Sequence, residues 1–218
     1  MVESYDSLIR RAVPRYDEMI ARLLDYLPAE ATDILELGSG TGNLSLELAR
    51  RFPAATVTYV DGSAEMLLVT RSRLERGGAP HHGEPRFIES RFEELPLAPQ
   101  SYDLIVSSIS LHHVVDKASL YRRLRAALRD GGALCFADQI RGEPEANHHV
   151  NWERWLEFCR APGNCSDDEI QSLLDHAAAH DYYTTLSDHV DMLAKAGFTS
   201  IDCVWRIWMW GIVTAVAG

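Results

Sequence analysis

The sequence predicts an α/β protein with a doubly wound, mostly parallel sheet, and three observations carry this prediction. Short apolar or β-branched segments alternate with segments of helical spacing along most of the 218 residues. A glycine-rich turn joins the first of these strands to the helix that follows it. Two apolar segments late in the chain supply further strands. Because 46% of the residues are apolar, the chain can bury one good core, and we expect a single domain over residues 1–218.

The alternation can be followed element by element. Helical spacing predicts helices over residues 17–27, 43–52, 63–74, 117–130 and 186–197. Apolar, β-branched and aromatic segments predict strands over residues 32–37, 56–61, 85–89, 103–108 and 133–138. Pro28 stops the first helix, Ser63 is placed to cap the third, and Gly131 with Gly132 should end the fourth. Strands alternating with helices in this way form a parallel sheet with helices on both faces.

The last third of the chain breaks this rhythm. Residues 141–184 form an insert in which helices are expected over 151–160 and 167–180. An insert after the fifth strand overhangs the carboxyl ends of the strands, where open α/β sheets bind ligands, so we expect a helical lid over the substrate. Residues 199–216 are apolar apart from Asp202 and Arg206 and predict two final strands that turn near Gly211.

Charge and composition narrow the classes of partner. A formal charge of −11 argues against a large nucleic-acid footprint, which needs clustered Lys and Arg. No window holds the 18 or so apolar residues of a membrane span, and the first residues mix charges from the start. The four cysteines are sparse and are expected to be reduced thiols. We therefore expect a cytoplasmic protein with a small, uncharged or cationic partner, and neither nucleic acid nor membrane.

The glycine loop "ELGSGTG" (36–42) raises the question of what lies against it. A dinucleotide fingerprint would need a glycine where the chain has Asn43, and no Gly-Lys-Ser/Thr follows as in a P-loop. Asp61 ends the next strand, where a carboxylate can accept both hydrogen bonds from a ribose diol. Bare glycine backbone can lie against an amino acid and a ribose where no phosphate needs neutralising.

At these residues the sequence resembles the class I S-adenosylmethionine-dependent methyltransferases. The matching segments are "ELGSGTG", "VDGS" with Met66 behind it, "EELPL" before "YDLIVSSISLHHV", "DGGALCFAD", and "MLAKAGF" before a two-strand end. They follow one another in the family's order over nearly the whole chain. The resemblance implies a Rossmann-like sheet of seven strands with the last one antiparallel, S-adenosylmethionine as cofactor and S-adenosylhomocysteine as product.

The resemblance also implies roles for individual residues. Those facing the methionine moiety and ribose would be Gly38, Ser39, Gly40 and Gly42 in the loop, with Ser108 under the methionine. Glu36 would support the loop or reach the amino group, Asp61 would take the ribose hydroxyls, and Gly62 and Met66 would border the adenine. The family usually has an acid for the adenine amine where this chain has Arg91, next to Phe92. Either the backbone and Phe92 hold the adenine, or Glu93 takes that place.

The N-terminal segment and the ending also resemble the carboxy-S-adenosylmethionine synthase branch. In that branch a tyrosine matching Tyr16 closes on the cofactor. The branch also uses an arginine before the last helix to hold an extra carboxylate, but residues 161–194 contain neither Arg nor Lys. Methyl transfer from ordinary S-adenosylmethionine is therefore the better interpretation.

Candidate catalytic residues follow the fourth and fifth strands. His112 and His113 come just past the fourth strand, and histidine titrates in the range that suits a base. Asp138 ends the fifth strand and points toward the same cleft. The plainer alternative is that the histidines are polar loop residues and that Asp138 caps a loop. A base is needed only if the acceptor must lose a proton.

The insert and the tail supply the remaining candidates. Trp155, Tyr182 and Tyr183 are candidate substrate contacts, although Trp155 also fits a core stripe. His176 and His180 lie one helical turn apart, but no third ligand is evident, so no metal is expected. Buried thiols are the simplest account of the cysteines. The spare faces of the three tail tryptophans, Trp205, Trp208 and Trp210, are candidates for a homodimer contact.

The sequence thus predicts direct SN2 transfer of a methyl group from S-adenosylmethionine to an oxygen or nitrogen of a small-molecule acceptor. Two alternatives remain open. The first is a tRNA-modifying enzyme, which the acidic charge disfavours. The second is a non-catalytic protein that binds S-adenosylmethionine. The feature that supports it is Arg91, which stands where the family usually has an acid. The acceptor, the methylated atom and the oligomeric state have no signature in the sequence.

Overall fold

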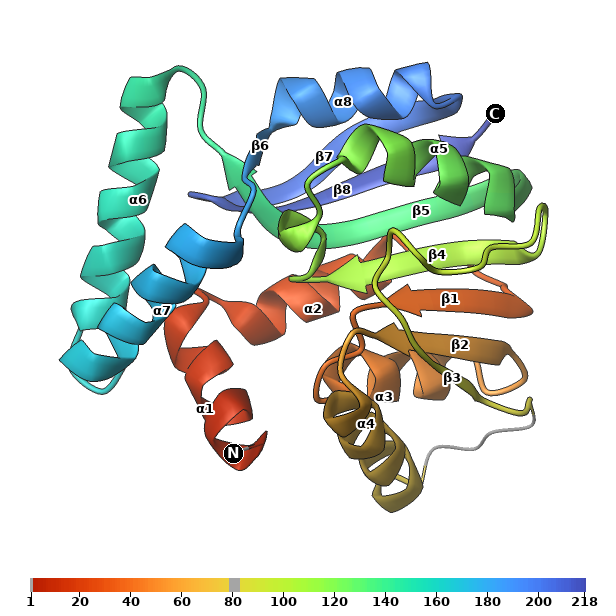
Figure 1. Cartoon of the computed structure of the whole chain (residues 1–218), viewed down its shortest axis with the longest axis horizontal. Coiled ribbons are helices and arrows are strands. Elements are labelled where there is room, and N and C mark those ends of the chain that lie inside the picture. The colour runs from red at the N-terminus through yellow and green to blue at the C-terminus, as the bar shows by residue number, and fades with distance from the viewer. Residues whose placement is uncertain (1, 79–82) are drawn as a thin grey trace.

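The structure, a computed structural model, describes residues 2–78 and 83–218. A single sheet runs through it with the strand order β3-β2-β1-β4-β5-β8-β7 (Figure 1). Its strands are β1 (Asp33–Leu37), β2 (Thr56–Asp61), β3 (Arg86–Glu89), β4 (Tyr102–Ser108), β5 (Leu128–Arg141), β7 (Phe198–Ile207) and β8 (Trp210–Ala217). β1 to β5 are parallel, whereas β8 is antiparallel to both of its neighbours. The predicted fold class, including the antiparallel last strand, is confirmed.

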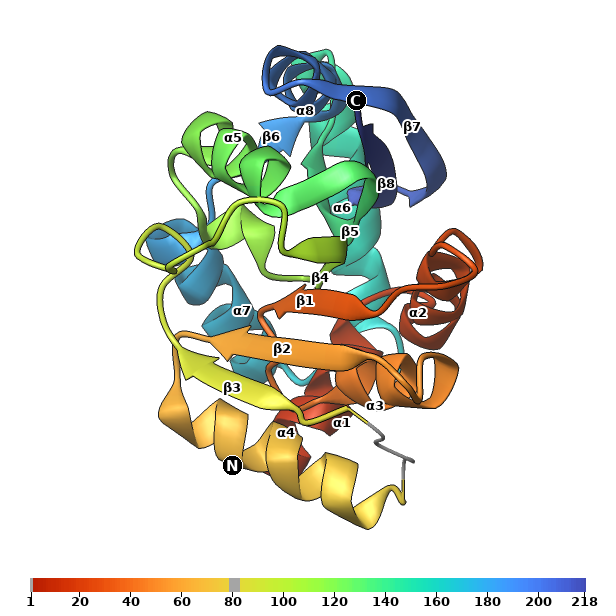
Figure 2. The same cartoon turned by 90° about the vertical axis from the view of Figure 1, so that its right-hand side faces the viewer.

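Helices cover both faces of the sheet, as expected for a doubly wound fold. The helices are α1 (Val2–Ala12), α2 (Tyr16–Asp25), α3 (Asn43–Arg51), α4 (Ala64–Arg76), α5 (Lys117–Ala127), α6 (Glu145–Arg160), α7 (Asp167–His180) and α8 (Leu186–Lys195). α2 and α3 pack on one face, and α5 and α8 pack on the other (Figure 2). Neighbouring residues of β1 divide between these layers, because Ile34 joins the first core and Leu35 the second. None of these helices has the length and apolar content needed to cross a membrane.

Three helices lie beyond the carboxyl ends of the parallel strands. α1, α6 and α7 gather at this end of the sheet (Figure 1), and the two-residue strand β6 (Thr184–Thr185) then pairs with the end of β5. The predicted bounds of α7, residues 167–180, are confirmed. Ser166 and Glu169 fix its start through the two reciprocal bonds of a capping box. α6 begins at Glu145, six residues earlier than predicted, directly after Pro144.

The structure corrects the prediction for the segment before β5. The fourth predicted helix ends at Ala127 rather than Asp130, and β5 begins at Leu128. Gly131 and Gly132 lie within this strand, where its pairing with β4 shifts register. A Cβ atom on Gly132 would lie 2.9 Å from the carbonyl oxygen of Arg129. These glycines therefore permit an irregular strand and do not cap a helix.

Candidate functional site

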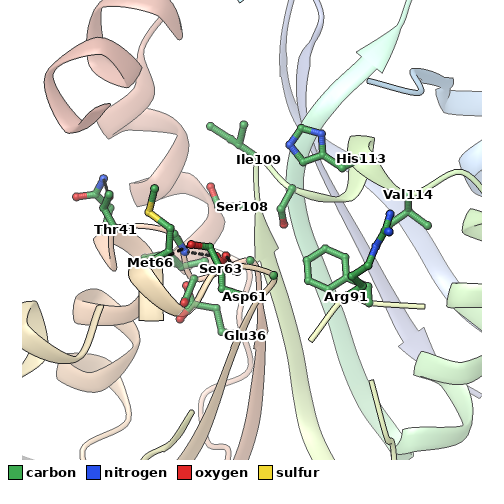
Figure 3. A pocket seen from close by; sticks show the side chains of 18 of the residues that line it. Glu36, Thr41, Asp61, Ser63, Met66, Arg91, Ser108, Ile109, His113 and Val114 are labelled. Atoms are coloured by element: carbon green, nitrogen blue, oxygen red, sulfur yellow. Dashed lines mark hydrogen bonds between the residues drawn. The ribbon is translucent and has the colours of Figure 1, made fainter. Parts of the chain in front are cut away.

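A pocket of about 380 Å³ opens at the carboxyl ends of β1, β2 and β4, in front of the glycine loop. It brings together all but one of the predicted cofactor residues, namely Tyr16, Glu36, Gly38, Ser39, Gly40, Asp61, Gly62, Met66, Arg91, Phe92 and Ser108. Glu36, Asp61 and Met66 lie on one side of Ser108, and Arg91 and His113 lie on the other (Figure 3). Its position is the crevice in which open α/β sheets bind ligands.

The glycine loop lines this pocket with backbone. Gly38 N–H and Ser39 N–H both donate to the carbonyl oxygen of Val60, at 2.8 and 3.0 Å. Gly38 has a φ of +75°, and a Cβ atom there would lie 2.3 Å from Ser110 Oγ. Glycine is therefore required at this position both for conformation and for space.

Gly42 is the predicted cofactor residue that does not line the pocket. It caps α3 with a φ of +82°, and a Cβ atom there would lie 3.1 Å from the Cα atom of Thr70. The Thr70 hydroxyl donates to the carbonyl oxygen of Gly40 over 2.9 Å. Gly42 therefore shapes the turn into α3 and lets α4 approach the loop.

Asp61 connects the loop to the start of α4. Its Oδ2 accepts a 2.8 Å bond from Gly40 N–H, and its Oδ1 accepts a 3.0 Å bond from Ser63 N–H. Each carboxylate oxygen retains a further lone pair, so both can still accept hydroxyl groups of a ligand. Ser63 accepts a bond from Met66 N–H, which confirms its predicted capping role. The carboxylate is thus held in place by backbone before any ligand binds.

Glu36 and Ser108 contribute buried polar atoms that lack partners. Glu36 is 1% exposed, and neither its Oε2 nor Ser108 Oγ has a hydrogen-bond partner among the described residues. Burial raises the pKa of Glu36 to about 8, with the charge of Asp61 adding to the effect and the nearby Ser45 hydroxyl opposing it. Unpaired buried groups are costly, so both atoms suit a ligand that carries a hydrogen-bond donor or a positive charge.

These features fit a nucleoside joined to an amino acid. The Asp61 carboxylate suits the ribose diol, and the glycine backbone leaves space beside it. The buried, unpaired Glu36 suits the ammonium of the amino acid. Arg91, Phe92 and Glu93 line the far side of the pocket, so the structure leaves both alternatives for the adenine contact open. Tyr16, the first residue of α2, lines the pocket near the glycine loop.

His112 and Asp138 form a buried pair behind the edge of the pocket. His112 belongs to the short helix η1 (Leu111–His113), and its Nδ1 lies 2.5 Å from Asp138 Oδ1. His112 N–H also donates to Asp138 Oδ2 over 3.1 Å. Burial opposes ionisation of this carboxyl, but the charge and hydrogen bonds of His112, with Gln139 N–H, lower the pKa of Asp138. Neither His112 nor Asp138 lines the pocket.

His113 lines the pocket, and its side chain is 41% exposed. Its Nδ1 lies 3.2 Å from Asp181 Oδ1 and 3.3 Å from the carbonyl oxygen of His180. Burial lowers the pKa of His113, but the nearby Asp181 carboxylate and the carbonyl of His180 outweigh it, so the net shift is upward. His113 is therefore the predicted catalytic residue that reaches the pocket.

Comparisons with known proteins agree with this geometry. A family model described as "Methyltransferase domain" matches residues 34–132. A carboxy-S-adenosyl-L-methionine synthase of Chromohalobacter salexigens is 29% identical over 212 residues, covering 93% of this chain and 76% of that protein. A trans-aconitate 2-methyltransferase of Deinococcus radiodurans is 30% identical over 177 residues, covering 80% of this chain and 61% of that protein.

A solved structure supports the same fold. Phosphoethanolamine N-methyltransferase 2 of Haemonchus contortus, in complex with S-adenosyl-L-methionine, superposes with a TM-score of 0.66 at 17% identity. The match covers 92% of this chain and 52% of that one. The chain is a class I S-adenosylmethionine-dependent methyltransferase. Its cofactor is S-adenosylmethionine, which agrees with the unpaired groups of the pocket.

The three predicted substrate residues of the methyltransferase, Trp155, Tyr182 and Tyr183, do not line the pocket at the glycine loop. Trp155 is 6% exposed, and its Nε1–H donates to the carbonyl oxygen of Ala12 over 2.9 Å. Tyr182 is 45% exposed, and its N–H donates to the carbonyl oxygen of His112. The Tyr183 hydroxyl donates to Asp181 Oδ2 over 2.7 Å. Trp155 thus joins α6 to the end of α1, while the two tyrosines lie around η1.

Sequence reasoning missed the part of the methyltransferase that α1 contributes. Asp6 bonds to Thr41, Asn43 and Arg73, and Ile9 lines the cofactor pocket. The polar side chains of Thr41 and Asn43, next to the glycines, were the available signal for a partner. Asp181 was also missed, and its neighbours in the sequence carry no motif that marks it.

Proposed function

We propose that the methyltransferase transfers the methyl group of S-adenosylmethionine to an oxygen or nitrogen of a small-molecule acceptor. The acceptor would bind between the cofactor pocket and residues 141–184. The observation that carries this proposal is the position of His113. It lines the cofactor pocket, and its Nδ1 also faces Asp181 from the segment that follows α7. An acceptor at His113 would lie between the cofactor and the helical insert, which would then act as the lid.

In the proposed chemistry the main task of the protein is to align the acceptor atom with the methyl group and the sulfur of the cofactor. S-adenosylmethionine supplies a methyl group already activated by the positive charge of its sulfonium. The glycine loop and Asp61 would hold the nucleoside, and Glu36 and Ser108 would receive the amino-acid end. His113 would orient the acceptor atom for in-line attack and would accept its proton where one must leave. His112 and Asp138 would position His113 from behind.

Two further observations support a small acceptor. The formal charge of −11 disfavours a polyanionic substrate such as tRNA. The name of the trans-aconitate 2-methyltransferase relative also indicates a small acid as acceptor in that protein.

The test is a panel of acceptors assayed for release of S-adenosylhomocysteine. Small carboxylates, amines and phenols would be compared with total tRNA, using the wild type, His113→Ala and the matched control His149→Ala, which changes an exposed histidine. We expect turnover with a small acceptor, and a kcat at least about tenfold lower in His113→Ala with unchanged binding of S-adenosylhomocysteine. Methylation of tRNA alone would overturn the proposal. Tight cofactor binding without turnover of any acceptor would favour the non-catalytic alternative.

Binding of S-adenosylhomocysteine should release a proton from Glu36. The pKa of about 8 leaves this buried carboxyl mostly protonated at pH 7, whereas the ammonium of the ligand favours its ionised form. Affinity should therefore rise with pH between 6 and 8, approaching a tenfold gain per pH unit well below pH 8. Calorimetric titrations at pH 7 in buffers of different ionisation enthalpy count the released proton.

The control variants for this experiment are Glu36→Gln and Glu47→Gln. Glu36→Gln should abolish the proton release, and Glu47→Gln, which changes a glutamate on α3 that pairs with Arg50, should retain it. Equal proton release in Glu36→Gln and the wild type would show that another group titrates.

A further inference from the structure

A compact group of histidine and aspartate side chains lies at the edge of the cofactor pocket. His112 and His113 come from η1, His176 lies on α7 one turn before its end at His180, and Asp181 follows that helix. Tyr182 N–H donates to the carbonyl oxygen of His112 over 2.8 Å, which fixes the end of this segment against η1. Residues almost seventy positions apart are thereby held together by backbone.

The donor atoms of this group converge on Asp181 Oδ1. That oxygen lies 3.2 Å from His113 Nδ1, 3.7 Å from His112 Nε2 and 4.0 Å from His176 Nε2. The donor atoms of His112, His113 and Asp181 all lie within 4.8 Å of one another. Two ligands that each bind one metal ion at about 2.0–2.2 Å are themselves about 3–3.5 Å apart, so small movements would complete a site.

The groups behind His112 and Asp181 orient these two ligands in the way metal sites require. The Asp138 carboxylate at His112 Nδ1 favours the neutral tautomer with its proton on Nδ1, and the lone pair of that tautomer is on Nε2, the atom that lies toward Asp181. Binding of the ion displaces the second proton of the charged ring. The Tyr183 hydroxyl donates to Asp181 Oδ2, which leaves Oδ1 as the free oxygen. A carboxylate behind a ligating histidine and a donor behind a ligating carboxylate are typical outer contacts of bound metals.

Asp181 Oδ1 is also an unsatisfied atom. The Asp181 side chain is 4% exposed, and among the described residues Oδ1 has no partner with hydrogen-bond geometry, although His113 Nδ1 is near. The Lys117 ammonium donates to the carbonyl oxygens of Val114 and Tyr182 and does not pair with this oxygen. A buried carboxylate oxygen without a hydrogen-bond partner favours a cation.

We propose that His112, His113 and Asp181 bind a divalent transition-metal ion, with His176 as a fourth ligand. Two or three imidazoles with one carboxylate suit zinc, cobalt or iron(II), whereas calcium and magnesium prefer sites built from oxygen alone. The side chains of His113 and His176 are 41% and 57% exposed, so the ion has a path of entry. Binding displaces the proton that His113 Nδ1 otherwise donates to the carbonyl oxygen of His180.

This site departs from the expectation that no metal binds. That expectation followed from the absence of a third ligand beside His176 and His180. Asp181, the residue after His180, provides a carboxylate near His176, and the other ligands come from η1. His180 faces the cluster with its carbonyl oxygen. If the proposed function holds, the ion lies where the acceptor binds and would take an acceptor oxygen as a further ligand, which sets the class of acceptor as one with an oxygen donor. The ion would then lower the pKa of that oxygen and replace His113 as the group that assists loss of its proton, because the ion occupies the lone pair of the ring.

Metal binding can be measured without any acceptor or turnover, so its failure is distinct from a failure of the proposed function. Protein treated with a chelator would be titrated with Zn²⁺ by calorimetry and with Co²⁺ by visible absorption. We expect one equivalent to bind with a dissociation constant of about 1 μM or tighter, and a Co²⁺ spectrum of nitrogen and oxygen ligands. Asp181→Asn should weaken binding at least tenfold, and Tyr183→Phe by about tenfold through loss of its outer contact.

Three controls make the result decisive. His149→Ala, an exposed histidine outside the group, should bind Zn²⁺ as the wild type does. Cys159→Ser with Cys165→Ser should do so too, because these two thiols lie next to each other and are a competing pair of soft ligands. Retained binding of S-adenosylhomocysteine shows that each variant is folded. No binding to folded wild type, thiolate absorption of Co²⁺, or unchanged affinity in Asp181→Asn would overturn the proposal.

Discussion

Replacing Asp61 with alanine is expected to weaken the binding of S-adenosylhomocysteine at least about 100-fold. Hydrogen bonds to a charged group contribute about 1.5–3 kcal/mol each, and the proposed contact to the ribose contains two of them. The substitution also leaves Gly40 N–H and Ser63 N–H without their acceptor, so the loop loses its preformed shape. Calorimetric titration of the wild type and Asp61→Ala measures the difference directly.

This experiment has an internal control in the helix that follows Asp61. Glu65→Ala removes an exposed carboxylate from the first turn of α4 and should leave the affinity within about twofold of the wild type. NAD, titrated in parallel, should not bind, because Asn43 replaces the third glycine of the dinucleotide fingerprint. An Asp61→Ala variant that binds within threefold of the wild type would mean that the ribose is held elsewhere.

Asp138→Ala is expected to lower the free energy of unfolding by about 3–5 kcal/mol. Asp138 is 1% exposed and accepts bonds from His112 N–H, from the His112 ring and from Gln139 N–H. Removing the carboxylate leaves these buried donors without an acceptor and creates a cavity beside them. Urea denaturation followed by circular dichroism measures the loss.

Two comparisons separate this effect from a general loss of an acidic residue. Asp191→Ala removes a carboxylate that is 72% exposed on α8 and should change stability by no more than about 0.5 kcal/mol. In a double-mutant cycle with His112→Phe, the coupling between the two positions should exceed about 1 kcal/mol, because they share one network. Additive losses in that cycle would show that Asp138 does not stabilise the fold through His112.

The residues that line the pocket at the glycine loop were largely predictable because they are local in the sequence. Gly38 and Gly40 lie in one turn, and Asp61 and Gly62 end the next strand, so a short motif specifies each half of the pocket. The parallel order of β1 and β2 then places both halves at the same edge of the sheet. The sequence motifs and the positions of their residues in the structure therefore agree at this pocket.

The rest of the site depends on contacts between distant segments. Asp6 meets Arg73 and the loop, and Asp181 meets η1, through packing that no local pattern records. Trp155 fitted both a core stripe and a substrate contact, and its bond to Ala12 arises because α6 packs against α1. Gly131 and Gly132 matched the end of a helix because an irregular strand demands the same backbone freedom.

The position of β8 inside the sheet determines how this part of the fold can assemble. β7 precedes β8 in the chain but lies at the edge, where its ladder partner is β8, while β8 also pairs with β5. β7 therefore cannot join the sheet strand by strand in chain order. The two must dock on β5 as a preformed hairpin, or β8 must dock first. In both cases the pairing of β7 with the sheet depends on β8, so a substitution that detaches β8 from β5 would remove β7 from the sheet with it.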